Sequence, residues 1–242
     1  HEGNARMYTD YTIMTAHRPL VREVNAVFDF IEKPYTPVNF KELLVSPNDM
    51  RKRLIALINK EIKNKEQGKE AYILAKVNHI TDRALIEKLY EASTAGVQVE
   101  LVVRGNCSLV TGIAGISENI HINGIIDRYL EHSRIFIFAN GGEEKYYIGS
   151  ADWMPRNLDN RIEVLAPVYD KDIQADLKRI VCYGYRDTAK GRIVDGTGEN
   201  RPWENRSSTL CKDFTPALAE AEAATVVFRS QEELYRKYKN TL

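Results

Sequence analysis

The chain has 242 residues, enough for one large or two small domains with a sizeable core. Its 34 basic and 34 acidic residues give a formal net charge of zero, which argues against a general nucleic-acid-binding protein but leaves room for a local basic pocket. No apolar run is long enough to cross a bilayer and no secretory signal pattern is found. We therefore expect a cytoplasmic protein without a transmembrane segment, whose Cys107, Cys182 and Cys211 are reduced thiols.

The first 37 residues combine a strand-like stretch, a helix and a linker. Residues 6–15 mix aromatic, β-branched and polar types as strands do, and residues 19–33 carry an apolar helical stripe with a proline near its start. Pro34-Tyr35-Thr36-Pro37 then ends the helix, because a residue that precedes proline avoids helical angles. The chain opens with His1, without an initiator Met, so we expect a piece of a longer protein.

The rest of the chain alternates strands and helices, as α/β domains do. Apolar and β-branched runs predict strands at 40–45, 71–77, 97–103, 120–126, 135–139, 145–150 and 161–167, and an edge strand at 190–194. Apolar stripes predict helices at 50–67, 82–95, 170–185 and 215–238, and the Gly, Asn, Ser and Pro content of 196–209 predicts a loop. The order strand, helix, strand over 71–103 predicts a parallel pair joined by a right-handed crossover.

His132 stands between a charged, helix-like segment, 127–131, and the strand expected from residue 135. Gly149-Ser150 closes the next strand, so the histidine and this turn can share one pocket. Imidazole acts as a nucleophile or an acid near neutral pH, and small residues let backbone N–H groups approach phosphate oxygens. The pattern favours phosphoryl chemistry. The alternative is a histidine that only binds a backbone carbonyl.

Arg104 follows the apolar run 99–103 and precedes Gly105, at the carboxyl end of a strand, where ligands of open α/β sheets bind. Its planar fork of donors suits phosphate, although a surface arginine that caps a strand end would look the same. More cations lie close in sequence to His132 or to the Gly149-Ser150 turn: Arg128, Arg134, Arg156 and Arg161. They indicate an anionic partner, unless they pair with acids equally close in sequence: Asp127, Glu131, Asp152 and Glu163.

Tyr8 shares one face of its strand with Arg6 and Asp10 if the residues alternate. It could stack on a nucleobase, but its position alone favours ordinary half-buried packing. Trp153 is interpreted as core or lid, and the chain has no Walker-type loop and no GxGxxG. No role is assigned to three further histidines: His17, His79 and His121.

Five segments of the sequence resemble the C-terminal portion of the bacterial polyphosphate kinase family. They are residues 5–11 (ARMYTDY), 30–35 (FIEKPY), 101–109 (LVVRGNCSL), 127–134 (DRYLEHSR) and 149–157 (GSADWMPRN). The resemblance runs from the first residue to about Val194. It implies an α/β fold of phospholipase-D-like type, a mixed β-sheet flanked by helices on both faces. It also implies a division into the end of a first such domain (1–36), a second domain (37–195), and a loop with a helical tail (196–242).

The resemblance also implies site residues and partners. Tyr8 matches the tyrosine that stacks on adenine, Arg104 an arginine that contacts nucleotide phosphates, and His132 the second-domain active-site histidine. Arg134 and Arg156 become candidate phosphate contacts. The implied partners are ATP and ADP, inorganic polyphosphate, upstream domains of the same chain and a homo-oligomeric copy, with no nucleic acid. The implied location is cytoplasmic, with a peripheral place at the inner membrane face as an alternative.

The implied reaction passes the γ-phosphate of ATP through a phosphohistidine to polyphosphate. The phosphorylated histidine and the residues linked to Mg²⁺ lie upstream of His1, so we expect no metal site here and no activity from these residues alone. Arg134 stands where phospholipase D enzymes carry lysine, and their later aspartate is missing. Two alternatives remain: half of a phospholipase-D-type phosphodiesterase or nuclease, or a non-catalytic oligomerisation module.

Overall fold

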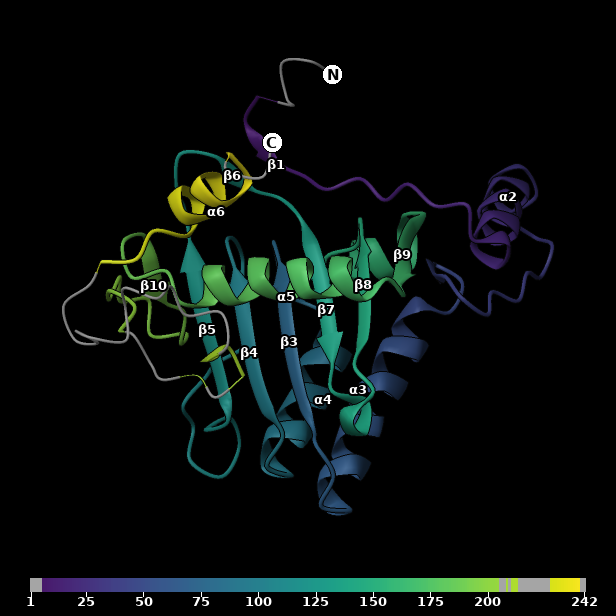
Figure 1. Cartoon of the computed structure of the whole chain (residues 1–242). Coiled ribbons are helices and arrows are strands. Elements are labelled where there is room, and N and C mark those ends of the chain that lie inside the picture. Colours follow the sequence, from purple (N-terminus) through teal and green to yellow (C-terminus); the bar gives the residue numbers. More distant parts are fainter. Residues whose placement is uncertain (1–5, 205–207, 209, 213–226, 240–242) are drawn as a thin grey trace.

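A computed structural model describes residues 6–204, 208, 210–212 and 227–239. An eight-stranded mixed sheet forms its centre, in the order β10-β5-β4-β3-β7-β8-β9-β2 (Figure 1). The strands are β2 (Leu44–Ser46), β3 (Tyr72–Val77), β4 (Gln98–Val103), β5 (Ile120–Ile125), β7 (Arg134–Phe138), β8 (Lys145–Gly149), β9 (Glu163–Val168) and β10 (Gly191–Ile193). Strands β3, β4 and β5 pair in parallel, whereas β7, β8, β9, β2 and β10 join antiparallel.

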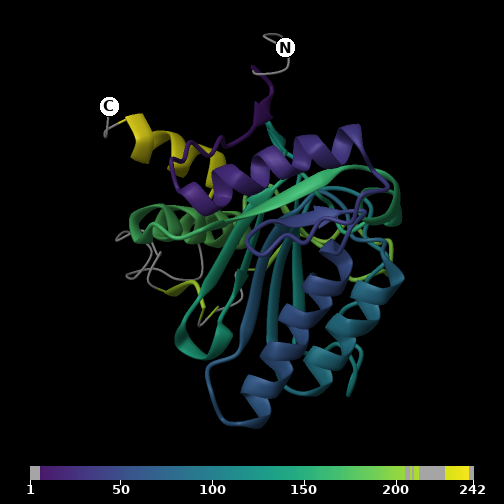
Figure 2. The ribbon, with the colours of Figure 1, turned by 90° about the vertical axis from the view of Figure 1, so that its right-hand side faces the viewer.

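Helices cover both faces of this sheet (Figure 2). Helices α3 (Met50–Glu66) and α4 (Arg83–Thr94) lie on one face, and α5 (Lys171–Tyr185) crosses the other. Strand β3 shows the consequence, because Ile73, Ala75 and Val77 join the core under α3 and α4 while Leu74 joins the core under α5. The predicted fold class, with its parallel pair β3–β4, is confirmed.

The N-terminal region differs from the expectation. Only β1 (Tyr8–Thr9) of the strand expected at 6–15 forms, and it pairs in parallel with β6 (Leu130–Glu131). The segment 127–131, which looked helix-like, therefore ends in a strand. Its polar side chains are bound by the chain around it, an arrangement that local helical preference cannot anticipate. Helix α2 (Arg18–Glu32) forms as predicted and shares an apolar cluster with residues of β2 and β9.

The remaining elements follow the predictions closely. The strand expected at 40–45 is shifted to β2, and the edge strand expected at 190–194 is β10. Short helices η1 (Asn140–Gly142) and η2 (Arg156–Asn160) follow β7 and precede β9. Of the tail helix predicted at 215–238, the structure shows α6 (Ser230–Lys239), residues 227–229 are not helical, and 215–226 lie outside the described residues. No described helix has the length and apolar character needed to cross a membrane.

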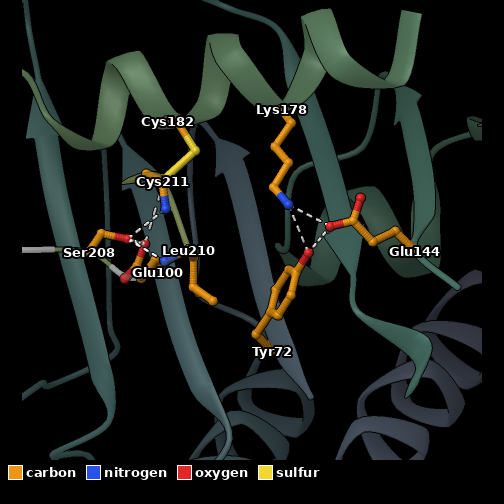
Figure 3. Close-up of a disulfide and its surroundings, with 8 residues drawn as sticks. All are labelled: Tyr72, Glu100, Glu144, Lys178, Cys182, Ser208, Leu210 and Cys211. Atoms are coloured by element: carbon orange, nitrogen blue, oxygen red, sulfur yellow. Dashed lines mark hydrogen bonds and ion pairs between the residues drawn. A yellow bond between two sulfur atoms is a disulfide. The ribbon is translucent and has the colours of Figure 1, made fainter. Parts of the chain in front are cut away.

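The expectation of three reduced thiols was wrong for two cysteines. Cys182 of α5 and Cys211 form a disulfide with a Cα–Cα distance of 5.3 Å, and Cys107 is free. Figure 3 shows this bond where the segment at Cys211 lies against the α5 face of the sheet. The two cysteines are 29 residues apart, and a spacing of this length carries no sign of pairing until the chain folds.

Candidate active site at the strand ends

Several strands begin or finish with polar residues at the same end of the sheet. The parallel strands β3 and β4 end there, β7 begins there opposite the end of β3, and β8 ends opposite the start of β7. In Figure 1 this is the upper edge of the sheet, below β1, β6 and α6. The carboxyl ends of strands in open α/β sheets are the usual place for ligands. The sequence-predicted residues His132, Arg134 and Arg104 all lie at these strand ends.

His132 is held on both sides of its ring. Its Nδ1 lies 2.7 Å from Asp10 Oδ1, and its Nε2 lies 3.2 Å from Arg134 Nη1. Tyr8 meets the imidazole edge-on, with ring centroids 4.7 Å apart. The His132 backbone N–H donates to Thr9 Oγ1 at 3.2 Å. Strand β1 thus brings Tyr8 and Asp10 to the same ring, as the expected alternation of residues implies.

These contacts assign the ring proton. A carboxylate only accepts hydrogen bonds and a guanidinium only donates them, so Nδ1 carries the proton toward Asp10 and Nε2 keeps its lone pair. The His132 side chain is 28% exposed, so the ring is open to solvent on part of its surface. In this tautomer Nε2, whose lone pair faces Arg134 Nη1, is the ring atom that can accept a proton or attack an electrophile.

Arg134 uses its guanidinium inside the protein. Its Nη2 donates to Asp152 Oδ2 at 3.0 Å, and its Nη1 also donates to the His132 carbonyl at 2.9 Å. Asp152 is 3% exposed. Burial alone would raise the pKa of its carboxyl, but the hydrogen bonds and charge of Arg134 hold it below its ordinary value. Arg134 therefore orients His132 and neutralises Asp152.

Arg104 is joined to the same group through Asn78. Its Nε donates to Asn78 Oδ1 at 2.9 Å, and the Asn78 backbone N–H donates to Asp152 Oδ1 at 2.8 Å. Among the residues that the structure describes, no hydrogen-bond partner is found for the two terminal nitrogens of Arg104. Burial and the nearby charge of Arg134 lower the pKa of this guanidinium, which still stays charged at neutral pH.

Arg156 opens helix η2 and is exposed, and its side chain has no hydrogen bond or ion pair to any described residue. Of the other cations noted near His132, Arg161 lies 3.9 Å from Glu163, and Arg128 lies over the ring of Tyr129. The acids flanking His132 are also paired inside the protein, Asp127 with Arg229 and Glu131 with the buried Lys76. The alternative of internal pairing therefore explains Arg134 and Arg161, whereas Arg104, Arg128 and Arg156 have no ion pair with a described residue.

A groove of about 440 Å³ borders this group. His132, Arg134, Gly149 and Ser150 line it together, so the histidine and the Gly-Ser turn do share one pocket. Tyr8 lines a neighbouring pocket of about 240 Å³, and Arg104 is not among the residues that line either one. His132 thus contacts both Tyr8 and Arg134. Arg104 belongs to the same polar network, because it bonds Asn78, which in turn bonds Asp152.

Sequence reasoning missed several members of the network. Asp10 was placed beside Tyr8 but given no role, and Asn78 was not noticed. Asn78 follows the end of β3 as Arg104 follows the end of β4, which was a usable signal, and His79, the next residue, was set aside. Trp153, interpreted as core or lid, is fully buried and stacks on Phe136. The described residues contain no group of three or more His, Cys, Asp or Glu side chains that could hold a metal ion.

Comparisons with known proteins agree with this picture. Residues 43–212 match the family described as polyphosphate kinase C-terminal domain 2. The polyphosphate kinase of Vibrio vulnificus strain YJ016 is 48% identical over 195 residues, which cover 81% of this chain and 28% of that protein. That of Escherichia coli K12 is 46% identical over 228 residues, which cover 92% and 33%.

Solved structures show the same relationship. The crystal structure of polyphosphate kinase from Porphyromonas gingivalis aligns with a TM-score of 0.84 and 37% identity, over 98% of this chain and 34% of that one. A looser likeness, with a TM-score of 0.46 and 17% identity, is to Nuc, a phospholipase D family member from Salmonella typhimurium. The chain spans about a third of the length of its curated relatives. It belongs to the polyphosphate kinase family.

Proposed function

We propose that this chain is the C-terminal part of an enzyme that transfers the γ-phosphate of ATP to polyphosphate. The observation that carries the proposal is the arrangement of His132 and Arg104 at the strand ends. The imidazole of His132 is fixed between Asp10 and Arg134, while the two terminal nitrogens of Arg104 have no partner among the described residues and can meet an anion. Phosphoryl transfer depends on such positioning and on cations around the transferred group.

His132 is the proton-transferring residue in this proposal. Its Nε2 accepts the proton of an attacking phosphate oxygen or, once protonated, donates it to a leaving oxygen. Asp10 stabilises the imidazolium that forms, as a carboxylate on the far nitrogen does in other histidine-dependent enzymes. Arg134 sets the direction of Nε2, because its guanidinium is itself held in place by Asp152 and the His132 carbonyl.

Arg104 and Arg156 would receive phosphate oxygens. In the described part of the chain, the two terminal nitrogens of Arg104 and the guanidinium of Arg156 have no hydrogen-bond partner, and guanidinium forms paired hydrogen bonds with phosphate. Tyr8, whose ring lies nearly perpendicular to that of His132, would stack on adenine. The phosphohistidine and the groups that bind Mg²⁺ would come from upstream domains. The described residues hold no cluster suited to a metal, so no step of this proposal is assigned to one.

The proposal predicts that these 242 residues alone make no polyphosphate, because half of the catalytic groups would be absent. The longer chain, in which the upstream two-thirds of a family enzyme precede His1, should be active. Turnover of ATP above background by the 242 residues alone would contradict this. Release of product from a phosphodiester substrate by either protein would instead favour the phospholipase-D-type alternative, and activity of neither would favour a non-catalytic module.

The test is made in the longer chain. His132→Ala should lower the rate of polyphosphate synthesis by about 10²- to 10⁴-fold, the usual range for a lost proton-transferring group. Arg104→Ala should weaken ATP binding by roughly tenfold to a hundredfold, the worth of one charged hydrogen-bonding group. His17→Ala is the matched control, because His17 lies beside Tyr169, outside the strand-end network. Wild-type kinetics in His132→Ala would refute the assignment.

A further inference from the structure

His79 lies against the backbone of the residue that follows Arg104. Its ring packs so closely on Gly105 that a Cβ built there would lie 2.4 Å from His79 Cε1 and 2.5 Å from Nδ1. No side chain fits at that distance, so the close approach requires glycine. Gly105 and the His79 ring therefore form one packed unit immediately beside Arg104.

The His79 side chain also anchors the loop that carries Arg104. The Asn106 backbone N–H donates to His79 Nδ1 at 2.9 Å. Backbone bonds complete the attachment, from Gly105 N–H to the Asn78 carbonyl and from Ile80 N–H to the Asn106 carbonyl, each 2.9 Å. Of the contacts that hold residues 105–106 to the turn after β3, the imidazole bond is the one made by a side chain that can change its charge near neutral pH.

His79 links this loop to a third turn. Its backbone N–H donates to Asp152 Oδ1 at 3.4 Å, and its carbonyl accepts the Trp153 N–H at 3.2 Å. The turns after β3, β4 and β8 thus meet at one residue. A shift of His79 would move Arg104 relative to Asp152, and so relative to Arg134 and His132.

Only the neutral ring can make this contact, because a protonated Nδ1 is a donor and would face the Asn106 N–H. The charged groups that face His79 are Asp152, Arg104, Arg156 and Arg134. Burial lowers the pKa of His79, Asp152 raises it in part, and the three guanidinium groups lower it further. The surroundings thus keep the ring neutral, and the acceptor intact, at neutral pH.

We propose that His79 is a positioning residue for the nucleotide-phosphate contact, and that its neutral ring holds Arg104 in place for an anion. The inference rests on the proposed function, in which Arg104 binds phosphate. Protonation of His79 would put an N–H opposite the Asn106 N–H, break the bond that holds residues 105–106, and so release the loop that carries Arg104. The affinity of the site for ATP would therefore fall as the pH drops below the ordinary histidine range, in addition to any change in the ligand's own charge.

The experiment measures dissociation constants for ATP and for inorganic tripolyphosphate in the longer chain by calorimetry between pH 5.5 and 8. The variants are His79→Ala, which removes the acceptor, and His79→Asn, whose Oδ1 can take the place of Nδ1 without titrating. His17→Asn is the matched control. Thermal unfolding of each variant shows whether it is folded, and His79→Asn keeps the test valid if His79→Ala is not.

At pH 8, His79→Ala should bind both ligands about tenfold more weakly, while His79→Asn should stay within about threefold of wild type. Between pH 7 and 5.5 the wild type should lose affinity more steeply than His79→Asn. Combined with Arg104→Ala, the His79→Ala change should add almost nothing, because it acts through Arg104.

The outcomes separate the two ideas. If the wild type does not bind ATP, or Arg104→Ala binds as tightly as wild type, the proposed function fails. If Arg104→Ala weakens binding but His79→Ala does not, the role given to His79 is overturned. It is also overturned if the effects of the two substitutions simply add, or if wild type and His79→Asn share one pH profile.

Discussion

Two polar clusters in this molecule contain buried charges, and they are built in opposite ways. The strand-end network, formed by Asn78, Arg104, His132, Arg134 and Asp152, lies where strands finish. The α5-face cluster, formed by Tyr72, Glu100, Glu144, Lys178 and Ser208, lies in the middle of the sheet beneath α5 (Figure 3).

The α5-face cluster is closed. Lys178 Nζ lies 2.5 Å from Glu144 Oε1 and donates to Tyr72 OH at 3.0 Å, and Ser208 Oγ donates to Glu100 Oε2 at 2.6 Å. The neighbouring disulfide ties the segment at Cys211 to α5. The strand-end network instead leaves the Arg104 terminal nitrogens without described partners. The two clusters therefore differ in the guanidinium donors that Arg104 leaves without a described partner at the strand ends.

This comparison predicts that substitutions in or beside the α5-face cluster change stability without changing ligand binding. Substitutions in the strand-end network should change ligand binding or rate more than stability. The disulfide gives the largest expected effect. Replacing both Cys182 and Cys211 by Ala frees a 29-residue loop and should lower the free energy of unfolding by about 3 to 4 kcal/mol. Urea unfolding under oxidising conditions measures this.

Cys107→Ala is the matched control for the disulfide, because Cys107 is the free cysteine. Reduction of the wild type should reproduce the loss seen in the double variant. ATP affinity of the longer chain should be unchanged in the double variant, and a loss of affinity would break the separation between the two clusters.

Glu100 gives the second largest effect, which depends on pH. Burial raises the pKa of this carboxyl to about 7, although Ser208 partly opposes the change. A raised carboxyl pKa means that the folded state binds the proton more tightly, so the contribution is present below the ordinary value of 4.5 and is lost as the pH rises toward 7. Glu100→Gln should therefore gain up to about 3 kcal/mol relative to wild type at pH 8, and little at pH 4.5.

Glu61 of α3 titrates in the same window, because burial also raises its pKa to about 7. Unfolding measured between pH 4.5 and 8 should therefore keep part of its pH dependence in Glu100→Gln, and lose most of it when Glu61→Gln is added. An unchanged pH dependence in the double variant would show that neither carboxyl is responsible.

Asp10 gives a smaller effect, on rate. Asp10→Asn keeps an acceptor near His132 Nδ1 but removes the charge that stabilises the imidazolium. Because the Asp10 side chain is 57% exposed, the charge is partly screened by water, and we expect a loss in kcat of roughly tenfold to a hundredfold in the longer chain. Thermal stability should stay near that of wild type. Asp29→Asn on α2 is the matched control, and an equal loss there would remove the special role of Asp10.

Gln231 of α6 gives the smallest effect. Its Nε2 donates to the Tyr129 carbonyl at 2.9 Å and to Glu131 Oε1 at 2.6 Å, and its Oε1 accepts the Tyr129 N–H at 3.0 Å. Gln231→Ala should cost about 1 kcal/mol and speed hydrogen exchange at the Tyr129 amide. It should change the rate only a few-fold, through the segment that leads to His132. Unchanged exchange at Tyr129 would show that α6 does not hold this segment.

The sequence by itself determined most of the elements and the family. Strands β3, β4, β5, β7, β8 and β9 and helices α2 to α5 were predicted near their observed bounds, because apolar periodicity is a local property of the chain. The same motifs indicated Tyr8, Arg104 and His132. The segment 127–131 and the strand expected at 6–15 were predicted poorly, since each is short and held by partners distant in sequence. The roles given to the site residues, and the domain boundaries at 36/37 and 195/196, stay predictions.

Only the tertiary structure decided which polar groups meet. Asp10 reaches His132 across 122 positions, Asp152 saturates Arg134 and leaves Arg104 open, and Cys182 joins Cys211. A charged side chain carries no periodic signal that names its partner, and several partners were equally close in sequence. The folded sheet selects the partners, because the order and register of its strands determine which strand ends lie side by side. Burial then makes each unpaired charge costly enough to select one arrangement.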